Sequence, residues 1–148
     1  MTRTRSILFL LVLFGGQTFA IQPALAEAPA LQRSERVLLE TMKALEMGSL
    51  GPSAARKTCR AEVAASKSVR SIREVSTGLF QVAEQDALGA FCAALVAAVE
   101  SGQLTSGFIE GSMSGNDEAR SLGVGRVIRA LYYAHRQSAA QSAQEAPR

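Results

Sequence analysis

The fold of this chain is decided by residues 86–102, which read DALGAFCAALVAAVESG. Large apolar side chains recur there at three- and four-residue spacing, and alanine or glycine fills most positions between them, which predicts a helix from Ala87 to Ser101. Asp86 is a favourable N-cap residue, and Gly102 is the residue type that most often follows a helix C-terminus. Because nearly every face of this helix is apolar or small, we expect it to lie at the centre of a helical bundle.

Two helices are expected before this central helix. Ser34 is predicted to cap the first, which ends at Gly48, and Ser53 is predicted to cap the second, which follows a turn at Gly51-Pro52. The two helices are marked by apolar residues at helical spacing: Leu38, Met42, Leu45, Cys59 and Val63.

Residues 69–83 carry conflicting signals. Val69, Ile72 and Val75 recur every three residues, which favours a helix, but Ser76-Thr77-Gly78 interrupts the pattern. The following residues 79–82 include the β-branched and aromatic types that suit a short strand. We therefore predict a loop or a broken helix here, with a hairpin as the alternative.

Two more helical segments are expected after the central helix. A short amphipathic segment runs from Thr105 to Met113, and Asn116 is predicted to cap a longer last helix. Gly123 and Gly125 are expected to weaken or kink the first part of that helix. The residues of this helix that follow the three- and four-residue spacing are Leu122, Val127, Ile128, Leu131, Tyr132 and His135.

The resulting fold class is all-α: a single-domain bundle of four to six short helices with one disulfide. The helical domain is predicted to span residues 34–137, between a flexible N-terminus at 27–33 and a disordered polar tail at 138–148. The core is expected to draw on Leu38, Leu45, Val63, Phe91, Leu95, Val96, Val99, Val127, Ile128 and Leu131.

The first 26 residues have the pattern of a secretory signal peptide. Two arginines precede the apolar run at residues 7–14, and small residues precede a predicted cleavage between Ala26 and Glu27. Cleavage after Ala20 is the alternative. The apolar run is shorter than the ~20 residues that a membrane span needs, so we expect no stable span after cleavage. This predicts a periplasmic or secreted protein.

Charge gives little support for nucleic-acid binding. Residues 1–26 hold two of the 16 basic residues and none of the 13 acidic ones, so the chain that remains is almost neutral. A solvated helix face explains the densest basic run, and a weak surface for an anionic partner or membrane lipid is the alternative. That run comprises Arg56, Lys57, Arg60, Lys67, Arg70 and Arg73, with Glu62 and Glu74 interleaved.

Cys59 and Cys92 are the two cysteines of the chain. An even count in an exported protein predicts a single disulfide between them, which would hold the second helix against the central one. Two separate buried thiols are the alternative.

We expect no catalytic, metal or cofactor site. His135 is the one histidine and is interpreted as a half-exposed imidazole at a helix end. The segment 111–115 has methionine where a nucleophile elbow needs serine, and Gly123-Val124-Gly125 lacks the third glycine of a dinucleotide motif. Tyr132 is expected in the core and Tyr133 on the surface.

Three features between residues 45 and 135 can be compared with known families: Cys59, Phe91-Cys92 at the start of a helix, and Ala130-Leu131-Tyr132 near the end of the last helix. Together they resemble the Rap/Tai type of exported helical immunity proteins, which neutralise cell-wall amidase effectors of type VI secretion. The further cysteines and the tyrosine–glycine signature of that family are missing, so we assign the chain to no family. Periplasmic acid-stress chaperones share its size and single disulfide but place their cysteines differently.

These observations predict a non-enzymatic exported protein that binds another protein or the cell envelope. The sequence identifies neither the partner nor the oligomeric state. An immunity or inhibitor-type protein that neutralises a cell-wall-degrading effector is the alternative function. A small periplasmic enzyme using His135 and a carboxylate is the third hypothesis.

Overall fold

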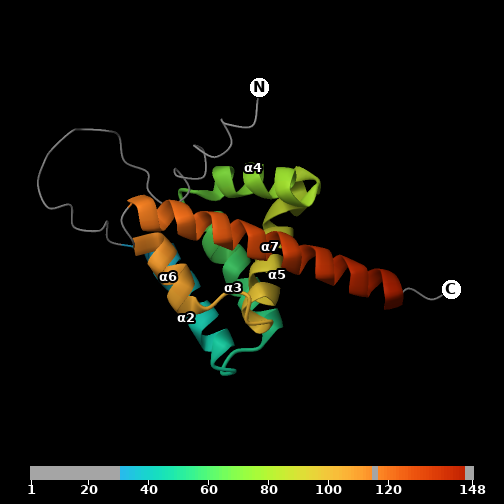
Figure 1. Cartoon of the computed structure of the whole chain (residues 1–148), viewed down its shortest axis with the longest axis horizontal. Helices are drawn as coiled ribbons and strands as arrows, with labels where there is room; N and C mark the ends of the chain where they lie inside the picture. The colour runs from blue at the N-terminus through green and yellow to red at the C-terminus, as the bar shows by residue number, and fades with distance from the viewer. Residues whose placement is uncertain (1–30, 115–116, 146–148) are drawn as a thin grey trace, which may run out of the picture.

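The computed structural model describes residues 31–114 and 117–145, and the side chains of 117–121 and 145 lie outside that description. The predicted signal peptide, the predicted cleavage residues Ala26 and Glu27, and the predicted N-cap Asn116 also fall outside the described residues. The described residues form helices and no strand, which confirms the all-α, single-domain fold (Figure 1). The elements are α2 (Arg33–Glu46), α3 (Pro52–Ala65), α4 (Val69–Phe80), the 3-10 helix η1 (Glu84–Asp86), α5 (Ala87–Glu100), α6 (Ser106–Ser114) and α7 (Asp117–Glu145).

Helix α5 is the centre of the bundle, as predicted. It packs most extensively against α3, α4 and α7, and less against α2. Helix α7 crosses the front of the bundle, and its C-terminal end extends beyond the other helices (Figure 1). The predicted core is largely buried, except that Phe91, Val127 and Ile128 are only half-buried. Phe91 and Val127 are partly exposed because they line a pocket.

The disulfide between Cys59 and Cys92 is present, with the two Cα atoms 5.8 Å apart. Both residues are fully buried. The bond joins α3 to α5, as the sequence predicted. One cross-link therefore ties the central helix to the N-terminal half of the bundle.

The predicted N-caps of the first two helices were wrong. Helix α2 has Gln32 rather than Ser34 as its N-cap, because the Glu35 carboxylate accepts a hydrogen bond from the Gln32 backbone N–H at 2.7 Å. Helix α3 begins at Pro52 rather than after Ser53. Proline is favoured at the first helical position because its missing N–H would have no partner there.

The prediction of a loop, a broken helix or a hairpin was wrong for residues 69–80, and a loop follows at residues 81–83. Helix α4 is continuous from Val69 to Phe80 and ends at Gln81, whose φ of 56° is left-handed. The four-residue spacing of Ile72, Ser76 and Phe80 gives the helix one face to pack against its neighbours. This packing outweighs the low helix propensity of Gly78, which is exposed.

Helix α7 runs without interruption through Gly123 and Gly125. It also continues to Glu145, eight residues beyond the predicted end of the helical domain at residue 137. Alanine and glutamine, which dominate this stretch, have high helix propensity, so the helix continues where nothing packs against it. Gly123 is needed for packing, because a Cβ built there would lie 2.9 Å from the Ser112 Cβ of α6.

Candidate functional site

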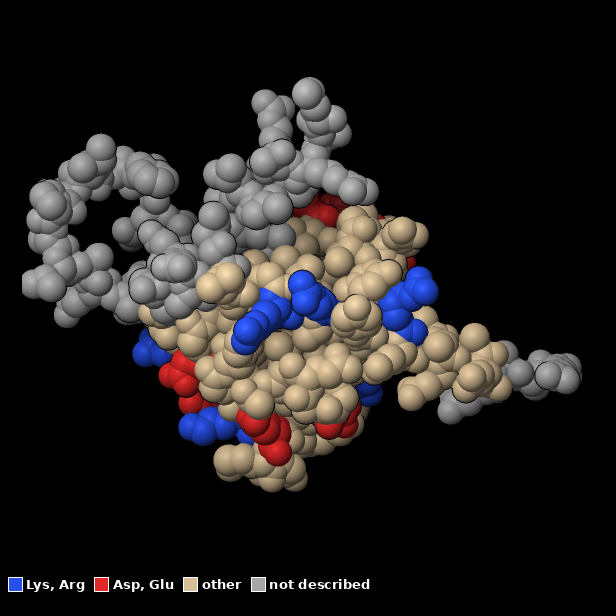
Figure 2. Space-filling view, viewed as in Figure 1, with Lys and Arg blue, Asp and Glu red and all other residues tan. Residues whose placement is uncertain are grey.

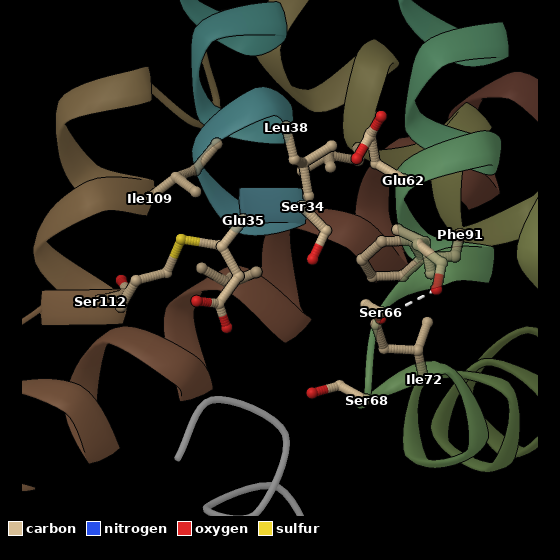
Figure 3. A pocket seen from close by; sticks show the side chains of 14 residues that line it. Ser34, Glu35, Leu38, Glu62, Ser66, Ser68, Ile72, Phe91, Ile109 and Ser112 are labelled. Carbon is tan, nitrogen blue, oxygen red and sulfur yellow. Dashed lines mark hydrogen bonds between the residues drawn. The ribbon is translucent and has the colours of Figure 1, made fainter. Parts of the chain in front are cut away.

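A pocket opens where α2, α3, α4, α5, α6 and α7 meet (Figure 3). Its walls are apolar and include Leu38, Val63, Ile72, Phe91, Met113 and Val127. Its volume is about 60 Å³. This is less than the roughly 150 Å³ of an apolar cavity that holds benzene, so the end of an aliphatic side chain suits it better than an aromatic ring or a cofactor.

Two carboxylates stand among the lining residues. Glu35 comes from the first turn of α2 and Glu62 from the last turns of α3, and both side chains are half-buried. Glu35 accepts the hydrogen bond from the Gln32 backbone N–H described above, and Glu62 has no ion-pair or hydrogen-bond partner among the described residues. The pocket therefore combines an apolar interior with negative charge.

Two of the serines that line the pocket use their hydroxyl groups in hydrogen bonds to nearby backbone carbonyls. The Ser66 hydroxyl donates to the Val63 carbonyl at 2.8 Å, and the Ser112 hydroxyl donates to the Phe108 carbonyl at 2.8 Å (Figure 3 shows the first bond). These donors point at backbone acceptors, so they do not add polarity to the apolar walls. The geometry favours an apolar group with a positive charge beside it.

The pocket was not predicted from the sequence, although the positions of its two acidic residues could have indicated it. Glu35 lies three residues before Leu38, and Glu62 lies three residues after Cys59. Both carboxylates therefore share a helix face with buried apolar residues. An acidic residue on an otherwise apolar helix face can indicate the edge of a pocket, although this pattern does not identify which helices meet there.

His135 lies in the middle of α7 rather than at a helix end, which corrects our interpretation. The helix continues ten residues further, to Glu145. The imidazole is half-buried and packs on Phe80 of α4, with ring centroids 4.6 Å apart. It makes no hydrogen bond or ion pair with any described residue.

The two tyrosines of α7 are both on the surface. Tyr132 is 38% exposed and Tyr133 is 55% exposed. The prediction of a core Tyr132 was wrong, because Leu131 and Ala134 occupy the buried side of the helix. The two rings meet edge to face with centroids 5.9 Å apart.

The six basic residues of the run on α3, α4 and the turn between them are all exposed, as expected of a solvated face. One ion pair is present in it, between Arg70 Nε and Glu74 Oε1 at 3.2 Å. Over the described ranges, no group of three or more His, Cys, Asp or Glu side chains is placed to hold a metal ion.

No single helix in the described part of the chain is long and apolar enough to cross a membrane. Taken together, α4 and the segment of η1 and α5 have the length and apolar composition of a membrane span, but the chain bends by 110° between α4 and that segment.

No protein-family model matches the chain, and no curated protein or solved structure is significantly similar to it. The resemblance to immunity proteins gains no support from these comparisons.

Proposed function

We propose that this protein is an exported, non-enzymatic factor that binds another protein, and that its pocket receives one side chain of the partner. The observation that carries the proposal is the apolar pocket with Glu35 and Glu62 among its lining residues. The disulfide is compatible with an oxidising compartment, which supports periplasmic or secreted localisation.

The occupant that best fits the pocket is the end of a leucine or methionine side chain next to a lysine or arginine. Burial of such an aliphatic side chain contributes about 1.5–3 kcal/mol. The neighbouring basic group would meet the free carboxylate of Glu62. One anchor in a pocket surrounded by further contacts is the usual arrangement of a protein–protein hot spot.

Site-specific photocross-linking in the producing cells tests the proposal. Lys67 is exposed and lies between two serines that line the pocket, so a photoreactive phenylalanine analogue there would reach a bound partner. In the same chain, Val127→Phe fills the pocket from α7. Ile128→Phe is the matched control, because Ile128 is half-buried and does not line the pocket.

The expected result is a covalent protein adduct that Val127→Phe abolishes and Ile128→Phe leaves unchanged. The adduct should map to a segment of the partner with an aliphatic residue beside a basic one. An adduct that survives Val127→Phe, or no adduct at all from Lys67, would contradict the proposal.

A further inference from the structure

The side of α7 that faces away from the bundle carries a second distinctive surface, which we call the arginine face: Arg126, Arg129, Tyr133 and Arg136. Their spacing of three, four and three residues places them on one side of the helix. All four are exposed, whereas Leu131 and Ala134 are buried on the opposite side. Figure 2 shows basic side chains along the course of α7, with no acidic side chain between them.

The positive charge of the arginine face is not neutralised locally. Residues 122–144 contain no aspartate or glutamate. None of the three guanidinium groups forms an ion pair with a described carboxylate. Arg126 and Arg136 instead lie 6.0 Å from the ring centroids of Phe108 and Tyr132. Three like charges on about 15 Å of helix repel one another, which favours a partner that supplies the opposite charge.

Helix α7 offers further surface beyond the arginine face. A hydrogen bond between Gln103 Nε2 and Gln137 Oε1 ties the helix to the loop after α5, and residues 138–144 are exposed on every side. This extension adds about 10 Å of helix whose side chains are mostly alanine, serine and glutamine. Short unsupported helices are marginal in water, and small side chains let another backbone approach closely.

We infer that the arginine face binds a helix of a partner protein that carries aspartate or glutamate at three- and four-residue spacing. This inference rests on the proposed function, but it uses the side of α7 opposite Val127 and the pocket. Charge complementarity selects an acidic partner, and a tyrosine flanked by arginines has the composition of protein–protein hot spots. A lipid surface fits less well, because most of the large apolar side chains described on α7 are buried or half-buried against the bundle, and the exposed Leu122, Tyr132 and Tyr133 are too few to form the continuous apolar face that an interfacial helix needs.

Carbodiimide cross-linking tests directly whether the arginine face contacts acidic side chains, because the reagent joins an amine to a carboxylate that is already in contact with it. The Arg129→Lys variant of the full chain places an amine in the arginine face. Arg60→Lys is the matched control, because Arg60 is also an exposed arginine but lies on α3. The product expected in the producing cells is an amide bond from the introduced lysine to an acidic helical segment of another protein.

In the Arg129→Lys chain, adding Arg126→Gln and Arg136→Gln should lower the yield of this product about tenfold, since two of the three charge pairs are lost. The inference is overturned if Arg129→Lys gives no more product than Arg60→Lys, or if the product joins two copies of this chain. Flotation with phosphatidylglycerol vesicles that requires the three arginines would also overturn it. Val127→Phe should leave the product in place, so failure of the pocket proposal and failure of this inference are distinguishable.

Discussion

Gly123→Ala tests the close contact between α6 and α7. A Cβ at this position would lie 2.5 Å from the Ser112 Oγ and 2.9 Å from its Cβ. Ser112 is buried and its hydroxyl already donates to the Phe108 carbonyl, so it has little freedom to move away. Overpacking of this kind costs about 1–3 kcal/mol. The higher helix propensity of alanine returns about 1 kcal/mol.

Gly125→Ala is the matched control, because Gly125 is exposed on the same helix and a Cβ there would meet no atom within 4 Å. We expect Gly125→Ala to stabilise the protein by about 1 kcal/mol, since it gains the propensity term alone. The free energy of unfolding of Gly123→Ala should be about 1–3 kcal/mol lower than that of Gly125→Ala, and this difference measures the contact with Ser112 alone. Urea unfolding followed by circular dichroism measures both values.

A double-mutant cycle sharpens the test. Ser112→Ala removes the nearest atom, the Oγ, so Gly123→Ala should be better tolerated in that background than in the native one. If Gly123→Ala stabilises the protein as much as Gly125→Ala does, the packing of α6 on α7 described above is wrong.

Three further predictions follow from other contacts. Reduction of the Cys59–Cys92 bond, which closes a loop with a sequence separation of 33, should lower the free energy of unfolding by about 4 kcal/mol; an unchanged thermal midpoint after full reduction would contradict this. Ser76→Ala should stabilise the protein by about 1 kcal/mol, because the Ser76 hydroxyl is buried without a partner among the described residues; a loss of stability in urea unfolding would reveal a hidden bond. The Ser106 hydroxyl and then its backbone N–H lower the pKa of Glu46 below its ordinary value of 4.5, so this contact stabilises the fold above pH 4.5 and is lost as the pH falls through the lowered pKa. Ser106→Ala should raise that pKa in an NMR titration of the Glu46 carboxyl, and an unmoved midpoint would refute the contact.

The central part of the fold was predictable because its signals are strong and local. The apolar run that begins at Ala87, together with the flanking Asp86 and Gly102, defines α5 closely, and Gly102 does adopt the left-handed φ of 71°. The cysteine pair followed from an even count and predicted export. In both cases a single interpretation accounted for most of the residues concerned.

The errors arose where tertiary packing or a competing cap decided the outcome. Helix α4 contains Ser76-Thr77-Gly78, which is unfavourable in isolation and is compensated by contacts with α5 that no local pattern encodes. Gln32 replaced Ser34 as a cap because Glu35 supplied the acceptor. The pocket forms where side chains of six helices meet, so its acids were visible in the sequence but its existence was not.

The intact mass of the protein isolated from the cells that make it reports both whether the chain has been cleaved for export and whether its two cysteines are bonded. We expect a chain that begins at Glu27 and lacks two hydrogens because Cys59 and Cys92 are bonded. Cleavage after Ala20 would move the start but would still support export. A mass that corresponds to a chain still beginning at Met1, with both thiols free, would contradict both expectations.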